Sequence, residues 1–393
     1  MTKKSLRAGY FLNFWSLPND RRLDWVFRTI LLGLAAQMLL SWSVWWTPNG
    51  VLPYLPITSF LDPWLAKSSM ILFPAFLLLL VVNLALKYKR VFLALLLLTG
   101  ILLVVGNIHR LQVWFYFYGL ILFLFLWESE VSDEIISGAI RGIIVGAYCW
   151  SGLHKFNIHF VEDIFPWLIE PLGWPIDSFP PSLAYLAGGV ELLIGLGLLF
   201  QFTRKFSVVG CLLFHGIILG LLGPLGHNWN IVVWPWNLVM PILVFLLFFK
   251  TKEIGLRNSA KAIVSFPAGL LVLFFVWILP AFNYTGFTPE QLSFKMYAGS
   301  QPEMVLYFGA VDRHLLGEHP TIYSSLPPDT TPRHRVILDD VAFAEWGIPL
   351  FTTEWTAQLL KKQFCPILQR PQEAGILYLV NDDFIRIPCL REH

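Results

Sequence analysis

The sequence predicts an all-α polytopic membrane bundle of about nine transmembrane helices, followed by a small C-terminal α+β domain outside the membrane. Nine apolar stretches lie between residues 25 and 282, and a membrane-spanning helix needs roughly 20 mostly apolar residues. The composition is 56% hydrophobic and 14% charged, whereas an average soluble protein is about 25% charged. Residues 283–393 differ from the rest, because they carry charges of both signs and only short apolar runs.

The predicted spans are residues 25–45, 68–87, 91–109, 113–127, 136–155, 182–200, 206–225, 229–249 and 262–282. The fourth is short, so it must tilt, thin the bilayer or lie partly within protein. The 17 tryptophans and 33 phenylalanines suit a protein with lipid-facing and interfacial aromatic side chains.

The distribution of Lys and Arg between the loops predicts an orientation. Cationic residues near the ends of spans favour the cytoplasmic side, and they gather in the N-terminal segment 1–24 and in loop 250–261. Loop 156–181 has four acidic residues and no Lys or Arg, whereas the acidic loop 128–134 is an exception to the pattern. We therefore expect an integral, multi-pass protein with segment 1–24 in the cytoplasm, a transmembrane domain over 25–282 and an extracytoplasmic domain over 283–393.

The C-terminal domain contains apolar runs at 304–308, 335–338 and 375–380 that predict strands, and an amphipathic helix is predicted at 352–363. On the oxidising side of the membrane, Cys365 and Cys389 are candidates for a disulfide; the alternative is two buried free cysteines. No Cys/His zinc spacing occurs, so we predict no metal site. The net charge is only +2 and predicts no nucleic-acid partner, which leaves the lipid bilayer and a protein docked on the C-terminal domain.

Polar residues within the spans suggest where a functional site lies, because a charge at bilayer depth is costly unless it is paired or hydrated. His154 and Lys155 end the fifth span, Glu191 lies near the middle of the sixth and His215 near the middle of the seventh. Four further candidates follow along the chain: His227, Asn228, Asn230 and Asn237. All fall at mid-membrane or on the expected outer side, which suggests an outward-facing cavity. In particular, Lys155, Glu191, His215 and Asn228 are predicted to line one pocket, with Glu191 and His215 meeting at one depth.

Each candidate also has a purely structural alternative. Lys155 at a helix end can extend its ammonium to the membrane interface, and Glu191 can be a protonated carboxyl that is hydrogen-bonded across helices. His215 can serve as an interhelical donor, and His227 and Asn228 can cap helices.

Three segments carry a family resemblance. Residues 151–157, SGLHKFN, resemble a small-Gly-aliphatic-x-Lys-apolar pattern at the outer end of a span. Residues 188–193, GGVELL, followed by Thr203 and Arg204, resemble the next span, and Phe214 with His215 resembles the span after it. On these motifs, residues 25–282 resemble the horizontally transferred transmembrane domain, the membrane unit of vitamin K-dependent gamma-carboxylase and its bacterial relatives. They also resemble DoxX-like and MauE-like membrane proteins.

The resemblance implies a chemistry for Lys155. In the carboxylase, the matching lysine is the proposed base that deprotonates a reduced quinone at the outer face. Two departures argue against glutamate carboxylation: the chain lacks the long β-rich region that binds the carboxylase's protein substrate, and residues 110–116 lack the histidine partner, with His109 out of register.

The resulting hypothesis is a membrane redox protein, an oxidoreductase if it is an enzyme, that binds a quinone-like lipid from its outer half. Lys155 would be the acid/base group, with Glu191 and His215 as relay or orienting partners. The cofactor would be bound by His154, His227, Asn228, Asn230 and Asn237. The alternative is a non-enzymatic membrane subunit or scaffold whose outer domain docks a partner, with the polar residues joining helices. A transporter comes third, since it would need more Gly- and Pro-interrupted spans.

Overall fold

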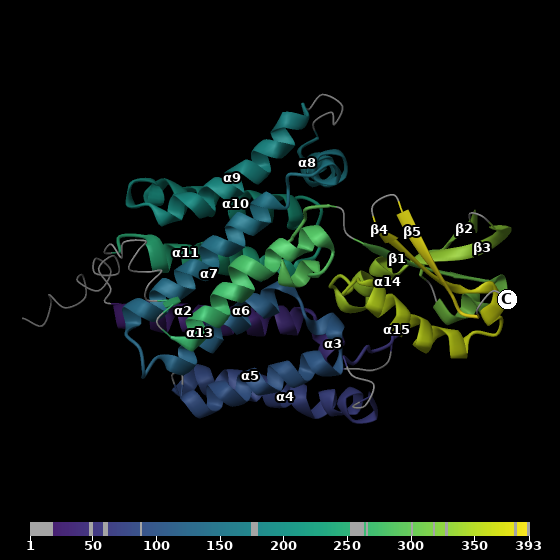
Figure 1. Cartoon of the computed structure of the whole chain (residues 1–393), viewed down its shortest axis with the longest axis horizontal. Helices are drawn as coiled ribbons and strands as arrows, with labels where there is room; N and C mark the ends of the chain where they lie inside the picture. Colours follow the sequence, from purple (N-terminus) through teal and green to yellow (C-terminus); the bar gives the residue numbers. More distant parts are fainter. Residues whose placement is uncertain are drawn as a thin grey trace, which may run out of the picture.

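The computed structural model describes residues 19–46, 50–57, 62–86, 89–173, 180–251, 263–264, 266–299, 302–316, 319–326, 329–380 and 383–390. Within these residues the chain forms a helical bundle with a small antiparallel sheet packed at one end (Figure 1). We call the end of the bundle that contacts the sheet the domain end, and the opposite end the far end. Most of the predicted cytoplasmic segments, 1–24 and 250–261, lie outside the described residues.

The bundle consists of apolar helices that run back and forth between the two ends. They are α2 (Asn19–Leu40), α4 (Asp62–Leu86), α5 (Arg90–Gly106), α6 (Val113–Leu124), α7 (Asp133–Leu153), α9 (Pro181–Leu199), α10 (Gln201–Leu222), α11 (Trp234–Phe248) and α13 (Pro267–Leu273). Seven helical segments of the described chain are long and apolar enough to cross a membrane. The predicted third and fourth spans correspond to two shorter apolar segments, Arg90–Gly106 and Val113–Trp127.

The first and ninth predicted spans are not single α-helices. The first breaks at Ser41, whose hydroxyl donates to the Gln37 carbonyl at 2.7 Å, and a short helix α3 (Trp42–Trp46) follows. The ninth passes from α13 into a π-helix, η9 (Phe274–Ile278), and then into a 3-10 helix, η10 (Leu279–Thr285). Pro280 lies in this last turn and has no N–H to continue an α-helical ladder.

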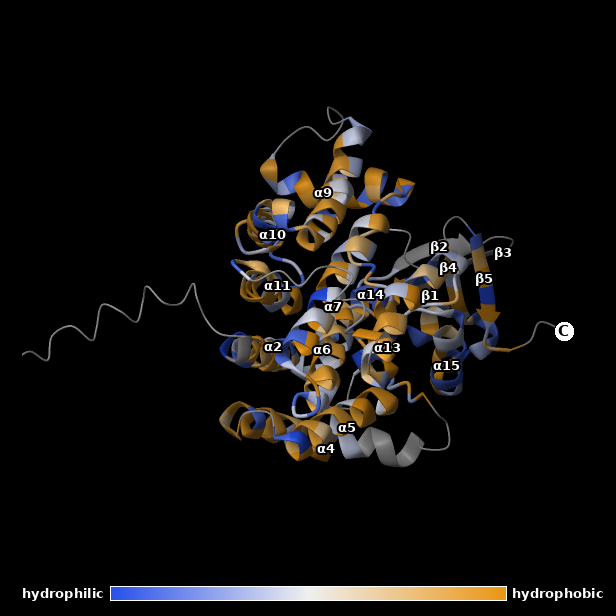
Figure 2. Ribbon diagram, turned by 60° about the vertical axis from the view of Figure 1, so that its left-hand side comes forward, coloured by the Kyte–Doolittle hydropathy of each residue, from blue (hydrophilic) through white to orange (hydrophobic). Residues whose placement is uncertain are grey.

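Side chains exposed on the bundle are largely apolar. Ile71 and Leu78 on α4 are 74% and 64% exposed, and Leu193 on α9 and Phe206 on α10 are 65% and 75% exposed. Figure 2 shows hydrophobic residues over the bundle helices and hydrophilic residues on part of the sheet domain. Large exposed apolar surfaces are unusual for soluble monomers, so this surface is compatible with contact to lipid.

At the far end, arginines satisfy the carbonyl groups that the last turn of α11 leaves without helical partners. Arg22 donates to the Leu246 carbonyl at 3.0 Å, and Arg141 donates to the Leu247 carbonyl at 2.8 Å. Cations at a helix C-terminus also interact favourably with the helix dipole. These two arginines place positive charge at the far end of the bundle.

The sheet has five antiparallel strands in the order β2-β3-β1-β4-β5. The strands are β1 (Glu303–Phe308), β2 (Ile322–Leu326), β3 (Asp329–Ile337), β4 (Gly375–Val380) and β5 (Asp383–Pro388), and the helices of this domain are α14 (Leu338–Trp346) and α15 (Glu354–Phe364). Central strand β1 places Val305 opposite Ile337 of β3 and Leu377 of β4.

The strands predicted at 304–308 and 375–380 are confirmed, and the helix predicted at 352–363 is α15, which begins after the capping residue Thr353. The strand predicted at 335–338 is wrong at both ends. Strand β3 begins earlier, at Asp329, and ends at Ile337, and Leu338 is the first residue of α14. Strands β2 and β5 and helix α14 were not predicted. The candidate cysteines Cys365 and Cys389 form a disulfide with a Cα–Cα distance of 5.4 Å.

The two parts of the chain are connected by side chains as well as by sequence. Ser43 donates to the Glu345 carbonyl at 2.7 Å, and the Glu345 carboxylate accepts the Val51 N–H at 2.7 Å. Buried His109 accepts the Phe351 N–H through Nδ1 at 3.1 Å. The sheet itself begins only at Glu303, so residues 283–299 form a connection that packs on the bundle. We call residues 290–299 of this connection the arch.

Candidate functional site

A buried ion pair joins the end of α7 to the middle of α9. The Lys155 ammonium lies 2.7 Å from the Glu191 carboxylate, and their side chains are only 10% and 7% exposed. Lys155 also donates to the carbonyl and hydroxyl oxygens of Ser151 at 3.2 and 3.1 Å, and to the Met296 carbonyl at 3.1 Å. An ammonium has three hydrogens, and the three oxygen atoms of Ser151 and Met296 accept them, so Glu191 contributes as an ion-pair partner rather than as a further hydrogen-bond acceptor. Lys155 is therefore fully coordinated in this arrangement rather than available as a free amine.

Glycines allow α7 and α9 to approach closely enough for this pair to form. A Cβ on Gly152 would lie 2.6 Å from the backbone nitrogen of Leu192, and a Cβ on Gly188 would lie 2.9 Å from the Lys155 Cβ. Small residues at such contacts are typical of helix packing in membranes. The glycine-rich motifs on either side of Lys155 and Glu191 thus set the distance between the two charged side chains.

His215 has partners other than Glu191, which corrects the prediction that the two meet. Its Nε2 lies 2.7 Å from the Tyr148 hydroxyl, and its Nδ1 lies 2.8 Å from the Asn237 side-chain oxygen. Because an amide oxygen only accepts, Nδ1 carries the proton and Nε2 accepts from Tyr148. Glu191 is near enough for an electrostatic interaction with His215 but bonds to the cation of Lys155 instead. A short chain from Tyr148 through His215 to Asn237 therefore links α7, α10 and α11.

Tyr148 was missed by the sequence analysis, although it lies seven residues before Lys155. Tyr148 lies within α7, whereas Lys155 lies in the turn that follows this helix. The Tyr148 hydroxyl also lies 3.0 Å from the sulfur of buried Cys211.

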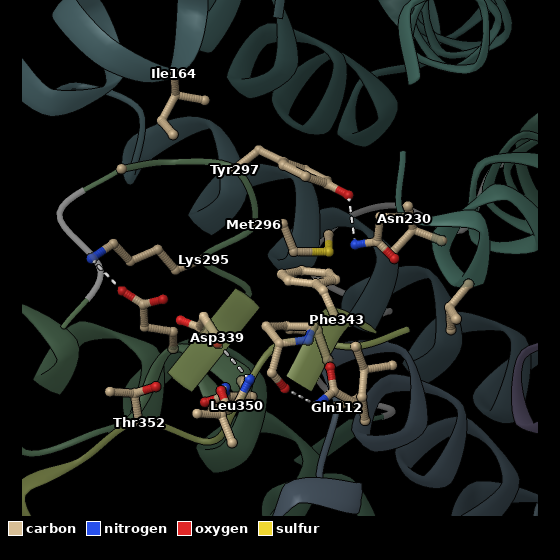
Figure 3. Close-up of a pocket in the computed structure, with 18 of the residues that line it drawn as sticks. Gln112, Ile164, Asn230, Lys295, Met296, Tyr297, Asp339, Phe343, Leu350 and Thr352 are labelled. Atoms are coloured by element: carbon tan, nitrogen blue, oxygen red, sulfur yellow. Dashed lines mark hydrogen bonds and ion pairs between the residues drawn. The ribbon is translucent and has the colours of Figure 1, made fainter. Parts of the chain in front are cut away.

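A cavity of about 400 Å³ lies where the bundle, the arch and the sheet domain meet (Figure 3). The bundle contributes Trp229 and Asn230, the arch contributes Met296 and Tyr297, and α14 contributes Phe343. The Met296 carbonyl accepts from Lys155, so the buried ion pair supports one wall of the cavity without lining it.

The prediction that Lys155, Glu191, His215 and Asn228 line one pocket is wrong for this cavity, since none of the four lies in its wall. Lys155 and Glu191 are used in the contact between α7 and α9, and His215 is held between Tyr148 and Asn237. Asn228 is an exposed turn residue with a left-handed backbone, φ 48°. Among the sequence-predicted site residues, Asn230 alone lines this cavity.

Asn230 and Tyr297 form the polar part of the cavity nearest to the bundle (Figure 3). The Asn230 amide nitrogen donates to the Tyr297 hydroxyl oxygen at 3.1 Å, so the hydroxyl hydrogen is left for another acceptor. The Asn230 oxygen is buried and has no hydrogen-bond partner within the described part of the chain. The pair therefore offers one donor and one acceptor to a ligand.

The sheet domain adds a partly buried carboxylate to the same cavity. Asp339, in the first turn of α14, accepts the Leu350 N–H at 2.8 Å. Burial raises the pKa of Asp339 to about 6, and the nearby Glu303 and Asp340 act in the same direction. Across the cavity wall, Lys295 pairs with Glu290 at 2.8 Å.

Aromatic rings make up much of the apolar wall. Trp229 lies at its centre, with ring-centroid distances of 4.8 Å to Phe343, 5.1 Å to Trp167 and 5.7 Å to Tyr297. His227 does not reach the cavity; it stacks on Trp167 at 4.3 Å, and its Nε2 lies 2.6 Å from the Trp167 carbonyl. His227 thus supports a residue of the wall.

His154 lies beside the arch but outside the cavity lining. Its ring is 5.0 Å from that of Tyr284 and 5.9 Å from that of Trp150. The described residues contain no group of three or more His, Cys, Asp or Glu side chains placed to hold a metal ion.

Comparison of the chain with protein-family models, curated proteins and solved structures found no match. The chemistry of the site is therefore argued from the residues themselves. It combines an aromatic, mostly apolar cavity, one hydroxyl donor and one unsatisfied amide acceptor with the charged side chains of Asp163, Glu290, Lys295 and Asp339, beside a buried ion pair.

Proposed function

We propose that the chain is a multi-pass membrane protein that binds the ring of a quinone-like lipid in this cavity. The observation that carries the proposal is the position of the Tyr297 hydroxyl and the unpartnered Asn230 oxygen in an aromatic cavity of about 400 Å³. Small-molecule sites are commonly clefts of roughly 300–1,000 Å³ with apolar walls and a few placed polar groups. The cavity has this size and this balance of groups.

The polar pair suits both redox states of such a ring. An oxidised quinone has carbonyl oxygens, which accept, and Tyr297 has a hydroxyl hydrogen to donate. A reduced quinol has hydroxyl hydrogens, and the Asn230 oxygen accepts. The rings of Trp229 and Phe343 would provide the apolar contact, since flat aromatic groups favour offset or edge-to-face packing.

The proposal assigns the Lys155–Glu191 pair a supporting role. An acid/base role, as the family resemblance implies, would require Lys155 to leave one of its acceptors. Lys155 contacts Met296, and Met296 lines the cavity. This shared contact supports a link between the ion pair and the cavity. We also propose that the far end, which carries Arg22 and Arg141, faces the cytoplasm and that the sheet domain lies outside; a reporter fused after His393 should then read outside.

The test is saturable binding by the purified full-length protein in detergent. Decylubiquinone should quench tryptophan fluorescence with a defined affinity, and an organic extract of the preparation should contain a quinone. Asn230→Ala and Phe343→Ala should weaken the affinity about tenfold, the effect of roughly 1.4 kcal/mol. The matched control is Phe384→Ala, which removes an exposed ring of β5 that is 44% exposed. Equal, unsaturable quenching in all four proteins, with no quinone in the extract, would overturn the proposal.

A non-enzymatic membrane subunit is the second candidate, and one observation favours it. Strand β5 is an edge of the sheet and exposes Phe384 and Ile385 by 44% and 45%. Exposed apolar residues on an edge strand suit pairing with another chain. Native mass spectrometry of the gently solubilised protein distinguishes the two candidates. The subunit candidate requires a partner protein bound in a fixed ratio, and Phe384→Asp should release that partner.

A further inference from the structure

We infer that Lys155 is a positioning residue that holds the strained arch, residues 290–299, so that Tyr297 faces the cavity. The consequence for binding rests on the proposed function, whereas the effect on the arch can be measured without any ligand. This role differs from that of a base, because it requires Lys155 to keep its proton.

Strain in the arch is visible in its backbone. Phe294 and Tyr297 have φ values of 55° and 49°, and Gly299 has a φ of 69°. Left-handed backbone is ordinary for glycine but disfavoured for bulky residues. Such conformations persist only where the surroundings hold them, and they concentrate at ligand sites. The arch is also tight against the bundle, since a Cβ on Gly299 would lie 2.8 Å from the backbone of His159.

The strained residues are held by groups of the bundle. Lys155 donates to the Met296 carbonyl, and Asn157 donates to the Ala298 carbonyl at 2.6 Å, so the carbonyls on both sides of Tyr297 are fixed by the turn that follows α7. Phe294 is completely buried and packs its ring 5.8 Å from that of Tyr116.

Of these two donors, Lys155 is the charged one. A hydrogen bond from an ammonium is stronger than one between neutral groups. Glu191 holds the ammonium in place, at 2.7 Å, so Glu191 acts on the arch through Lys155. Removing the ammonium would release the Met296 carbonyl, and Tyr297 could then relax away from Asn230.

The experiment compares hydrogen–deuterium exchange of peptides from residues 290–299 in the full-length protein without ligand. We expect Lys155→Met to raise exchange in the arch at least tenfold, and Lys155→Arg, which keeps a charged donor, to restore most of the protection. The control is Lys205→Met, which removes an exposed lysine from α10. A double variant, Lys155→Met with Glu191→Leu, avoids an unpaired buried carboxylate and serves if the single variant does not fold.

The affinity for decylubiquinone is measured in the same variants. Loosening of the arch with a tenfold weaker affinity supports the inference and the proposed function together. If the arch loosens in Lys155→Met but the wild-type protein binds no quinone, the positioning role is supported and the proposed function is wrong. An arch that exchanges as in the wild type in both Lys155 variants overturns the inference.

Discussion

The Lys155 ammonium and the Glu191 carboxylate meet at 2.7 Å although 36 residues separate them in the chain. The contact forms where Gly152 and Gly188 let α7 and α9 touch, and the same ammonium reaches the carbonyl of Met296 in the arch. One charged group therefore connects two helices of the bundle to a wall of the cavity. A substitution of Lys155 or Glu191 should therefore affect both the contact between α7 and α9 and the wall of the cavity.

Removing one member of the pair should cost more than removing both. Lys155→Met or Glu191→Leu alone leaves a buried uncompensated charge, and we expect each to lower the free energy of unfolding by roughly 3–5 kcal/mol. The double variant should recover most of this loss, because two apolar side chains fill the site. Thermal unfolding of the detergent-purified proteins measures the cycle; losses that simply add in the double variant would contradict a coupled pair.

The helix contact itself should be sensitive to a single methyl group. Gly152→Ala places a Cβ 2.6 Å from the Leu192 nitrogen. This is a backbone atom, so no change of side-chain rotamer can relieve the clash. We expect α7 and α9 to separate and stability to fall by about 1–3 kcal/mol, the usual range for overpacking. Gly216→Ala on α10 is the control, since a Cβ there would meet no atom within 4 Å. Equal melting temperatures for the two variants would show that the contact is not tight.

The disulfide should stabilise the sheet domain. Cys365 and Cys389 are 24 residues apart, and closing a loop of this length stabilises a fold by about 3.5 kcal/mol in the chain-entropy description. Replacing both cysteines with serine should therefore lower the unfolding temperature of the domain. The control is Cys149→Ser, which changes a free buried cysteine; this variant should still unfold at a lower temperature when a reductant is added, as the wild type does. A wild-type melting curve that does not change with reductant would argue against this contribution.

Local patterns were sufficient to predict much of the fold. Short apolar runs predict β1 and β4, and an amphipathic pattern predicts α15, because these features depend on residues close together in the sequence. Strand β5 was missed because its burial is low and uneven, with Asp383 and Phe384 both exposed. Long apolar stretches gave the bundle, but not the break at Ser41.

The candidate site was harder to predict, because its walls come from three separate segments. Asn230 could be identified as a polar residue beside a span, whereas Phe343 had no signal that separated it from an ordinary helix residue. Nothing in the sequence indicates a left-handed backbone at Phe294 or Tyr297, since aromatic residues seldom adopt it. Likewise, the choice of Lys155 over His215 as the partner of Glu191 depends on how helices pack, which composition and spacing do not determine.

The partly buried carboxylate of Asp339 should give the protein a pH-dependent stability. Partial burial raises the pKa of Asp339 from its ordinary value of 3.8 to about 6, so between these values the folded protein binds a proton that the unfolded chain has released. Stability should therefore fall as the pH rises from about 4 to about 6 and then level off. Asp339→Asn keeps an oxygen for the Leu350 N–H but cannot ionise, so it should lack this fall and be more stable than the wild type above pH 6. Melting temperatures at pH 4.5, 5.5, 6.5 and 7.5 test this directly, with exposed Asp383→Asn as the control. A difference between wild type and Asp339→Asn that does not change with pH would show that the carboxyl titrates normally, and the cavity would then be more open to water than its packing indicates.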